Sequence, residues 1–150
     1  LGISAEEARD RVLDAIESGK ARAKFTEWIV AQGGDKTLAE NPALLPEASI
    51  KYEVKANFEG YISKMNAEEI GVASVILGAG RETKDSVIDH SAGIVLVKKL
   101  GDKVSVGDTL AVLHTNDEKA ISAAEKKFLG AISVSENNVE LGKLIYKIIR

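Results

Sequence analysis

The chain opens with apolar residues at helical spacing. Val12 and Ile16 stand four residues apart on one face of a predicted helix that begins after Ser4. Ser4 and Glu7 have the spacing of a capping box, in which each side chain bonds a free backbone N–H of the first turn. Gly19 is typical of a helix end. The pattern predicts a first helix between Ser4 and Gly19.

A second helix is predicted over residues 20–32, where Phe25, Trp28 and Ile29 share one face. Gly33 follows and favours its termination. Trp28 could serve as a stacking platform for a nucleobase. The helical spacing, however, already explains it as an apolar anchor beside Phe25.

Strand patterns begin after a connector that carries both prolines of the chain. Ile50, Tyr52 and Val54 alternate with charged residues, which is typical of a half-buried strand. We therefore predict an α+β chain, with helices followed by a small subdomain of mixed strands and helices. The expected segments are 1–35 (helical), 36–48 (connector) and 49–150 (subdomain), and the further predicted strands cover residues 61–64, 94–97, 103–106, 110–114, 132–134 and 144–149.

Two more helices are predicted within this subdomain. The first begins after Asn66, whose side chain can cap it together with Glu69, and the second covers residues 118–129. Their apolar residues recur at helical spacing, so we expect these positions to face the core: Ile70, Ala73, Ile76, Leu77, Ile121, Ala124 and Phe128.

Composition narrows the function classes. Apolar residues make up 45% of the chain and charged residues 29%, with a net charge of -3. No basic block is present, so a nucleic-acid partner is not expected. The chain has no cysteine, which excludes disulfides and thiolate chemistry. It shows no signal peptide and no apolar run of the ~20 residues that a membrane span needs. We expect a cytoplasmic protein without a membrane partner, and, because Leu1 is not methionine, a fragment of a longer one.

The segment Gly78-Ala79-Gly80-Arg81 invites comparison with a phosphate loop. Phosphate loops place their glycines between a strand and a helix N-terminus. Here the glycines follow a predicted helix C-terminus, where the helix dipole repels anions. The sequence therefore favours a helix end and a mobile loop, with Arg81 free to reach a neighbour.

The histidines do not form an evident catalytic or metal site. Asp89-His90-Ser91 contains the residue types of a catalytic triad, but adjacent side chains point in different directions and rarely assemble one. His114 ends a predicted strand and has no potential metal ligand at suitable spacing. We expect no catalytic residue and no metal ligand in this chain.

Gly101-Asp102 and Gly107-Asp108, followed by Asn116 to Ala120, resemble a biotinyl or lipoyl carrier domain. In such a domain, Lys119 would be the modified lysine at a hairpin tip. A predicted helix follows Lys119 in place of a returning strand, so the likeness is better explained by a shared barrel-sandwich geometry. Asp102 and Asp108 are then turn formers.

The order of the motifs carries a further resemblance. The residues from Leu77 to Lys84, the segment from Asp89 to Ile94 and the paired Gly-Asp turns are together similar to the C-terminal region of pyrimidine-nucleoside phosphorylases, including thymidine phosphorylases. Ser18 to Phe25 and Gln32 to Asp35 resemble the helices that precede it. The resemblance implies that residues 1–35 belong to the α/β-domain of a longer enzyme. It also implies a barrel-sandwich-like (hammerhead) subdomain.

The same resemblance implies a reaction in which orthophosphate attacks a pyrimidine nucleoside and releases the free base and a pentose 1-phosphate. The family's phosphate-binding, base-binding and potassium-binding motifs are absent from this chain. We therefore expect it to be inactive alone and to need no cofactor, with orthophosphate as co-substrate and possible potassium in the parent. The expected partners are the missing N-terminal and central parts of that parent enzyme. The parent itself is expected to be a homodimer.

The resemblance also suggests that Gly78, Gly80 and Arg81 belong to a loop that helps to close the substrate cleft. Two alternatives remain open at this point. The first is a carrier module modified at Lys119, and the second is a structural binding module that uses the same fold.

Overall fold

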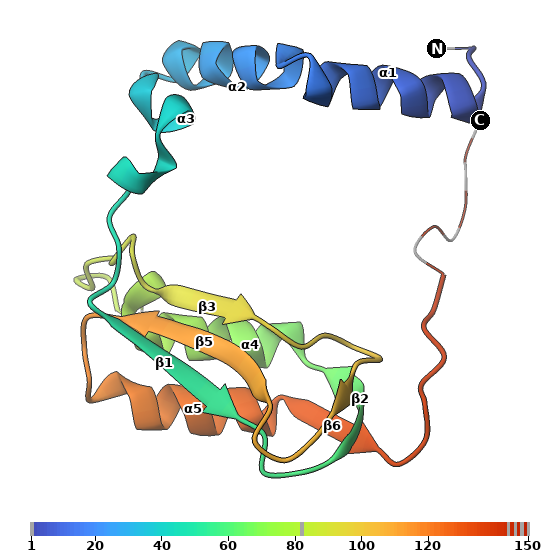
Figure 1. The fold of residues 1–150 in the computed structure, drawn as a ribbon. Helices are drawn as coiled ribbons and strands as arrows, with labels where there is room; N and C mark the ends of the chain where they lie inside the picture. Colours follow the sequence, from blue (N-terminus) through green and yellow to red (C-terminus); the bar gives the residue numbers. More distant parts are fainter. Residues whose placement is uncertain (1, 82, 144, 146, 148, 150) are drawn as a thin grey trace. The chain divides into compact units, whose positions relative to one another are not determined.

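The structure is a computed structural model that describes residues 2–81, 83–143, 145, 147 and 149. The chain divides into two compact units, Leu1–Pro46 and Glu47–Arg150. The described part of the first unit is helical, and the second unit holds all six strands of the described residues together with the remaining helices (Figure 1). Each unit is described by itself below.

The first unit begins with α1 (Ala5–Glu17) and α2 (Lys20–Ala31). Ser4 caps α1 as predicted, because its Oγ accepts a hydrogen bond from the Glu7 N–H at 3.1 Å. The Glu7 carboxylate bonds to Arg11 at 2.7 Å. Ser18 and Gly19 separate the two helices, and Gly19 has φ 77°, which explains why a glycine stands there.

Residues 36–48, predicted only as a connector, contain the short helix α3 (Thr37–Glu40) and a 3-10 turn over Pro42–Leu44. Local side-chain bonds form them: the Asp35 carboxylate accepts from the Thr37 N–H at 2.8 Å, and Asn41 Oδ1 accepts from the Ala43 N–H at 3.3 Å. Such one-turn elements lack the hydrophobic periodicity that reveals longer helices.

The second unit contains two three-stranded antiparallel sheets, ordered β1-β5-β3 and β4-β2-β6. The α+β class is therefore confirmed, with two separate sheets and no closed barrel among the described residues. Their strands are β1 (Ile50–Lys55), β2 (Gly60–Met65), β3 (Gly93–Leu96), β4 (Lys103–Val104), β5 (Thr109–Thr115) and β6 (Ile132–Ser135). The strand predicted over residues 144–149 falls partly on positions 144, 146 and 148, which lie outside the described residues.

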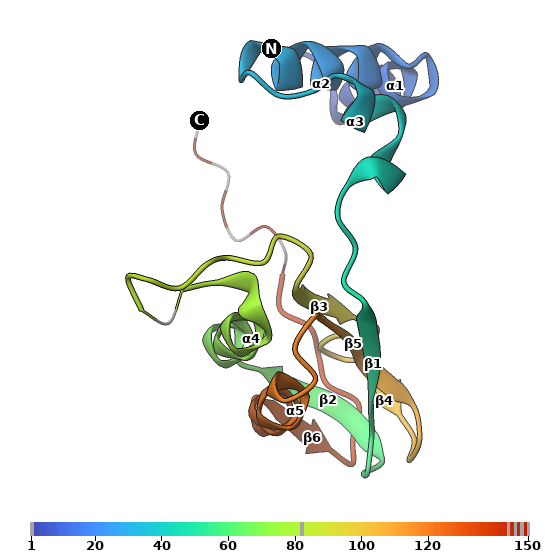
Figure 2. The same cartoon turned by 90° about the vertical axis from the view of Figure 1, so that its left-hand side faces the viewer.

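Two helices, α4 (Ala67–Ser74) and α5 (Ala120–Gly130), pack side by side in this unit (Figures 1 and 2). Most of their predicted core positions are confirmed, since Ala73, Leu77, Ala124 and Phe128 are buried and Ile70 and Ile76 pack against them. Ile121 is half-buried. Apolar residues of both sheets complete this core: Val54, Ile62, Val104, Leu110, Ala111 and Leu113.

The helix α4 is capped at its N-terminus and continues into a further helical turn at its C-terminus. Asn66 Oδ1 accepts from the N–H groups of Glu68 at 3.1 Å and Glu69 at 3.4 Å, as predicted. At the other end, α4 continues into a π-helical turn, η2 (Val75–Ala79), in which Gly78 adopts φ 108°. This positive φ ends the helix and releases the chain into the loop that follows.

Candidate functional site

The glycine loop, residues 78–88, begins within the last two residues of η2 and leads to the segment before β3. A Cβ atom on Gly78 would lie 3.4 Å from the Asp89 Cβ, and a Cβ on Gly80 would lie 2.7 Å from the Val75 Cγ2. Gly78 also needs its positive φ. Glycine is therefore required at Gly78 by backbone conformation and at Gly80 by the Val75 side chain.

The outer part of the glycine loop is open to solvent. Arg81, Thr83, Lys84 and Asp85 are exposed, and Val87 is 90% exposed. The Ser86 Oγ accepts from the Thr83 N–H at 3.0 Å and forms a local turn. Within the described residues, Arg81 takes part in no salt bridge. Its guanidinium can bond a ligand or neighbour without first breaking an ion pair to a described residue.

The ends of the glycine loop are held firmly. The Asp89 N–H donates to the Gly78 carbonyl at 2.9 Å and closes the loop. The buried Thr115 Oγ, at the end of β5, donates to the Leu77 carbonyl at 2.9 Å. The same hydroxyl oxygen accepts from the Asp117 N–H at 3.1 Å. Thr115 therefore donates a hydrogen bond to a carbonyl in the last helical turn, where carbonyl groups commonly lack an intrahelical partner.

Asn116 connects the other end of the loop to β1. Its Oδ1 accepts from the backbone N–H and from the Oγ of Ser49, each at 2.8 Å. Its Nδ2 donates to Asp89 Oδ2 at 2.8 Å and to Ser91 Oγ at 3.0 Å. We call Ser49, Asp89, Ser91, Thr115 and Asn116 the loop-base cluster.

Asp89 is the charged member of the loop-base cluster. The Ser91 hydroxyl and backbone N–H both donate to its Oδ1, at 2.6 and 2.9 Å. The hydroxyl of Ser91, then its N–H and then the Asn116 amide lower the pKa of Asp89 below its ordinary value. Asp89 is thus held as a carboxylate that accepts several bonds, which suits an anchor of backbone structure.

The sequence predicted that the adjacent residues Asp89, His90 and Ser91 would not assemble a catalytic triad. Asp89 and Ser91 do bond to each other, whereas His90 is exposed and lies outside these bonds. His114 is half-buried in β5. No group of three or more histidine, aspartate or glutamate residues suited to a metal ion occurs in the part of the chain that the structure describes.

Lys119 directly precedes α5, and its backbone N–H donates to Asp117 Oδ1 at 2.9 Å. The chain therefore continues from β5 into a helix, as predicted, and Lys119 does not stand at the tip of a hairpin. Within the described residues, no helix has the length and apolar character to cross a membrane.

Sequence reasoning did not identify Ser49, Thr115 or Asn116 as members of one cluster. Thr115 offered one signal, since it is a polar residue that directly follows the predicted strand over residues 110–114. Ser49 and Asn116 are 67 residues apart, and only the pairing of β1 with β5 brings them together.

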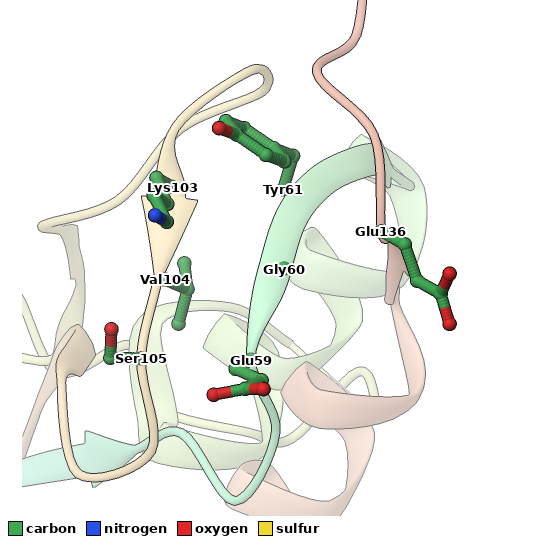
Figure 3. Close-up of a pocket in the computed structure, with 7 residues that line it drawn as sticks. All are labelled: Glu59, Gly60, Tyr61, Lys103, Val104, Ser105 and Glu136. Atoms are coloured by element: carbon green, nitrogen blue, oxygen red, sulfur yellow. The ribbon is translucent and has the colours of Figure 1, made fainter.

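A separate groove of about 440 Å³ is lined by residues of the paired strands β2 and β4 and by Glu136, which follows β6. Figure 3 shows Tyr61 and Lys103 on these two strands, with Glu136 pointing away from them. The lining contains two carboxylates, Glu59 and Glu136, and only one cation, Lys103. A phosphate site needs an excess of hydrogen-bond donors and positive charge, so this groove does not fit one.

Comparison with known proteins finds a matching family and related enzymes. Residues 61–135, half of the chain, match the family described as the pyrimidine nucleoside phosphorylase C-terminal domain. The chain is 45% identical over 146 residues to a pyrimidine-nucleoside phosphorylase of Staphylococcus epidermidis and 44% identical over 144 residues to one of Staphylococcus aureus. These matches cover 97% and 96% of this chain and 33% of each relative. The chain spans about a third of the length of these curated relatives.

Proposed function

Because the chain belongs to the pyrimidine nucleoside phosphorylase C-terminal domain family, we propose that it is the C-terminal part of an enzyme that cleaves pyrimidine nucleosides with orthophosphate. The products are a free base and a pentose 1-phosphate. The observation that carries this proposal is the 45% identity to a pyrimidine-nucleoside phosphorylase over 97% of the chain. An identity of this extent covers both units and the connector between them.

The proposed enzyme must hold phosphate and nucleoside together and stabilise the charge that develops at the sugar. Among the described residues, the side chains of the loop-base cluster form hydrogen bonds to backbone groups and to one another. The groove beside β2 has more carboxylates than cations. These features support the proposal that this chain is inactive alone and that the reacting groups lie in the rest of the enzyme.

The exposed apolar residues of α1 and α2 support the same proposal. Val12, Ile16, Phe25 and Trp28 are each 50% exposed or more, although their spacing is that of buried helix faces. Contiguous exposed apolar surface on a helix marks an interaction site. In the proposed enzyme these faces pack against the part of the longer protein that precedes this chain.

We assign the glycine loop to the closing of the proposed active site. Its two ends are fixed by Thr115 and Asn116, while its outer residues are exposed. A loop built in this way can fold over a bound ligand and exclude water, which strengthens each charge interaction beneath it. Arg81 is the residue on this loop best suited to contact an anionic or carbonyl group of the ligand.

The activity is tested by comparing the isolated chain with a full-length enzyme that contains it. Each protein is incubated with thymidine or uridine and orthophosphate, and release of the base is followed by absorbance. We expect turnover of about 1 to 1,000 per second for the longer protein and none for the isolated chain. Turnover by the isolated chain at that level would contradict the proposal, as would absence of phosphorolysis in the longer protein.

The loop assignment is tested by Arg81→Ala in the full-length enzyme. The loss of a charge-assisted hydrogen bond should lower kcat/KM by about tenfold, because each tenfold corresponds to roughly 1.4 kcal/mol of lost transition-state binding. The melting temperature should stay unchanged, since Arg81 is exposed. Lys84→Ala, which removes another exposed cation of the same loop, is the matched control. Equal effects of both variants, or a loss of stability without a kinetic change, would refute the assignment.

A further inference from the structure

Asn116 bonds to two segments that are far apart in the sequence. Its Oδ1 faces Ser49, which directly precedes β1, and its Nδ2 faces Asp89 and Ser91 at the end of the glycine loop. Asn116 itself directly follows β5. One amide side chain thus joins the start of one strand, the end of a second strand and the end of the loop.

The amide can take only one orientation in this position. Ser49 presents two donors, its N–H and its hydroxyl, so the amide atom that faces it must be the oxygen. The Asp89 carboxylate is an acceptor, and the Ser91 hydroxyl already donates its hydrogen to Asp89 Oδ1. The atom that faces these two groups must therefore be the nitrogen, and all four bonds are satisfied together.

Thr115 and Asn116, which are adjacent in the chain, hold opposite ends of the glycine loop. Thr115 bonds the Leu77 carbonyl before the loop, and Asn116 bonds Asp89 after it. We infer that Asn116 is a positioning residue, which fixes the end of the glycine loop against β1 and so determines where Arg81 stands. The link to catalysis rests on the proposed function, whereas the positioning of the loop does not.

Asn116 acts on the loop more than on the overall stability of the fold. It is exposed, so water can replace its hydrogen bonds if the loop opens. Thr115, in contrast, is fully buried, and its hydroxyl has no such replacement. A displacement of about 1 Å in a catalytic arrangement can cost a factor of about 100 in rate, so a residue that only positions a loop can still have a large kinetic effect.

The decisive variant is Asn116→Asp in the isolated 150-residue chain. It keeps the shape of the side chain and an oxygen toward Ser49, but it replaces the NH2 group with an oxygen that faces the Asp89 carboxylate. We expect amide hydrogen exchange to become about tenfold faster at residues 83–91, because like charges replace a charge-assisted bond. Exchange in β2 and β6 should keep its wild-type rate.

Asn57→Asp is the matched control. Asn57 is exposed, and its side chain forms no hydrogen bond within the described residues, so the same change of charge should leave loop exchange unaltered. Asn116→Ala serves as a second variant that adds no charge, and it should accelerate loop exchange by a smaller factor. Unchanged loop exchange in both Asn116 variants, or equal acceleration throughout the second unit, would overturn the inference.

In the full-length enzyme, Asn116→Asp should raise KM for the nucleoside or lower kcat by about tenfold while the melting temperature stays near that of wild type. The two readouts separate the two proposals. Faster loop exchange without any phosphorolysis by the wild-type enzyme would leave Asn116 as a positioning residue and reject the proposed reaction. Wild-type phosphorolysis with unaltered loop exchange in the Asn116 variants would reject the positioning role alone.

Discussion

At the scale of single residues, the paired Gly-Asp turns show how the same short motif is used twice. Asp102 Oδ2 accepts from the Lys99 N–H at 2.7 Å, and Asp108 Oδ2 accepts from the Ser105 N–H at 3.1 Å. In each turn the backbone N–H of the aspartate also donates to the carbonyl three residues earlier, at 3.0 Å. Both aspartates are therefore turn formers, as predicted from the sequence.

The glycines of these turns place them against the rest of the subdomain. Gly101 and Gly107 have φ of 87° and 90°, a conformation that other residues rarely adopt. The Gly101 N–H donates to the Ile62 carbonyl and the Gly107 N–H to the Ala56 carbonyl, each at 2.8 Å. The small repeat in the sequence is thus a repeat in three dimensions.

Asp108 makes a pH-dependent contribution to stability. The Ser105 N–H and then the Lys98 ammonium lower its pKa in the folded state. A carboxylate with a lowered folded pKa stabilises the fold above its unfolded pKa of about 3.9, and this stabilisation is lost as pH falls through the folded value. Asp108→Asn should therefore be less stable than wild type at pH 6, and this difference should shrink as pH falls below the unfolded pKa. Urea midpoints measured across this range test the expectation, and a difference that persists at low pH would contradict it.

Two glycines should respond to alanine with opposite signs. Gly60 has φ 136°, and a Cβ there would lie 2.6 Å from the Ser135 carbonyl oxygen, so Gly60→Ala should cost about 1–3 kcal/mol. Gly71 lies inside α4 with open space around it, so Gly71→Ala should stabilise by about 0.5–1 kcal/mol. Urea unfolding of both variants measures the two changes, and a shared sign would show that local backbone conformation does not control them.

At the scale of secondary-structure elements, four helices have similar amphipathic patterns but different surroundings. The apolar faces of α4 and α5 are covered by each other and by the sheets, and they contribute buried residues such as Ala73 and Phe128. The described residues of α1 and α2 include none that is buried. The pattern thus predicts a helix and its apolar face, and only the neighbouring elements decide whether that face is covered.

The cap of α4 is open to a direct test. Asn66→Ala removes the acceptor for the Glu68 and Glu69 N–H groups and should lower stability by about 1 kcal/mol. Asn66→Asp keeps an acceptor at the same place and should restore most of the loss, because a negative charge also suits a helix N-terminus. Thermal or urea unfolding provides the measurement, and equal losses in the two variants would show that the cap has no role.

At the scale of the whole molecule, the chain consists of two units that differ in how much apolar surface they bury. The second unit holds the hydrophobic core, whereas the described residues of the first unit contain no buried side chain. Local unfolding should therefore require much less free energy in the first unit than in the second.

Trp28 is the only tryptophan and lies on α2 in the first unit, so its fluorescence reports on the surroundings of α2. Its side chain is 59% exposed. In the isolated chain, acrylamide should quench it almost as efficiently as in the unfolded state, and the cooperative unfolding seen by circular dichroism should bring little change in its emission. A blue-shifted emission that moves to longer wavelength together with that transition would contradict this expectation.

Much of the fold could be predicted because it depends on local patterns. Alternation at Ile50, Tyr52 and Val54 predicted β1, and Asn66 with Glu69 predicted the start of α4. Helical spacing also predicted the burial of Ala124 and Phe128. These features arise from neighbours in the sequence, whose periodicity reflects which face meets the core.

The sequence by itself determined the class of the fold, the helix caps, the Gly-Asp turns and the motifs that resemble the phosphorylase family. Only the tertiary structure decided that Ser49, Asp89 and Asn116 meet at the base of the glycine loop. It also decided that the strands form two separate sheets. The physical reason is that caps and turns bond over a few residues, whereas these contacts join residues 27 to 67 positions apart and exist only once β1 and β3 have each paired with β5 in register.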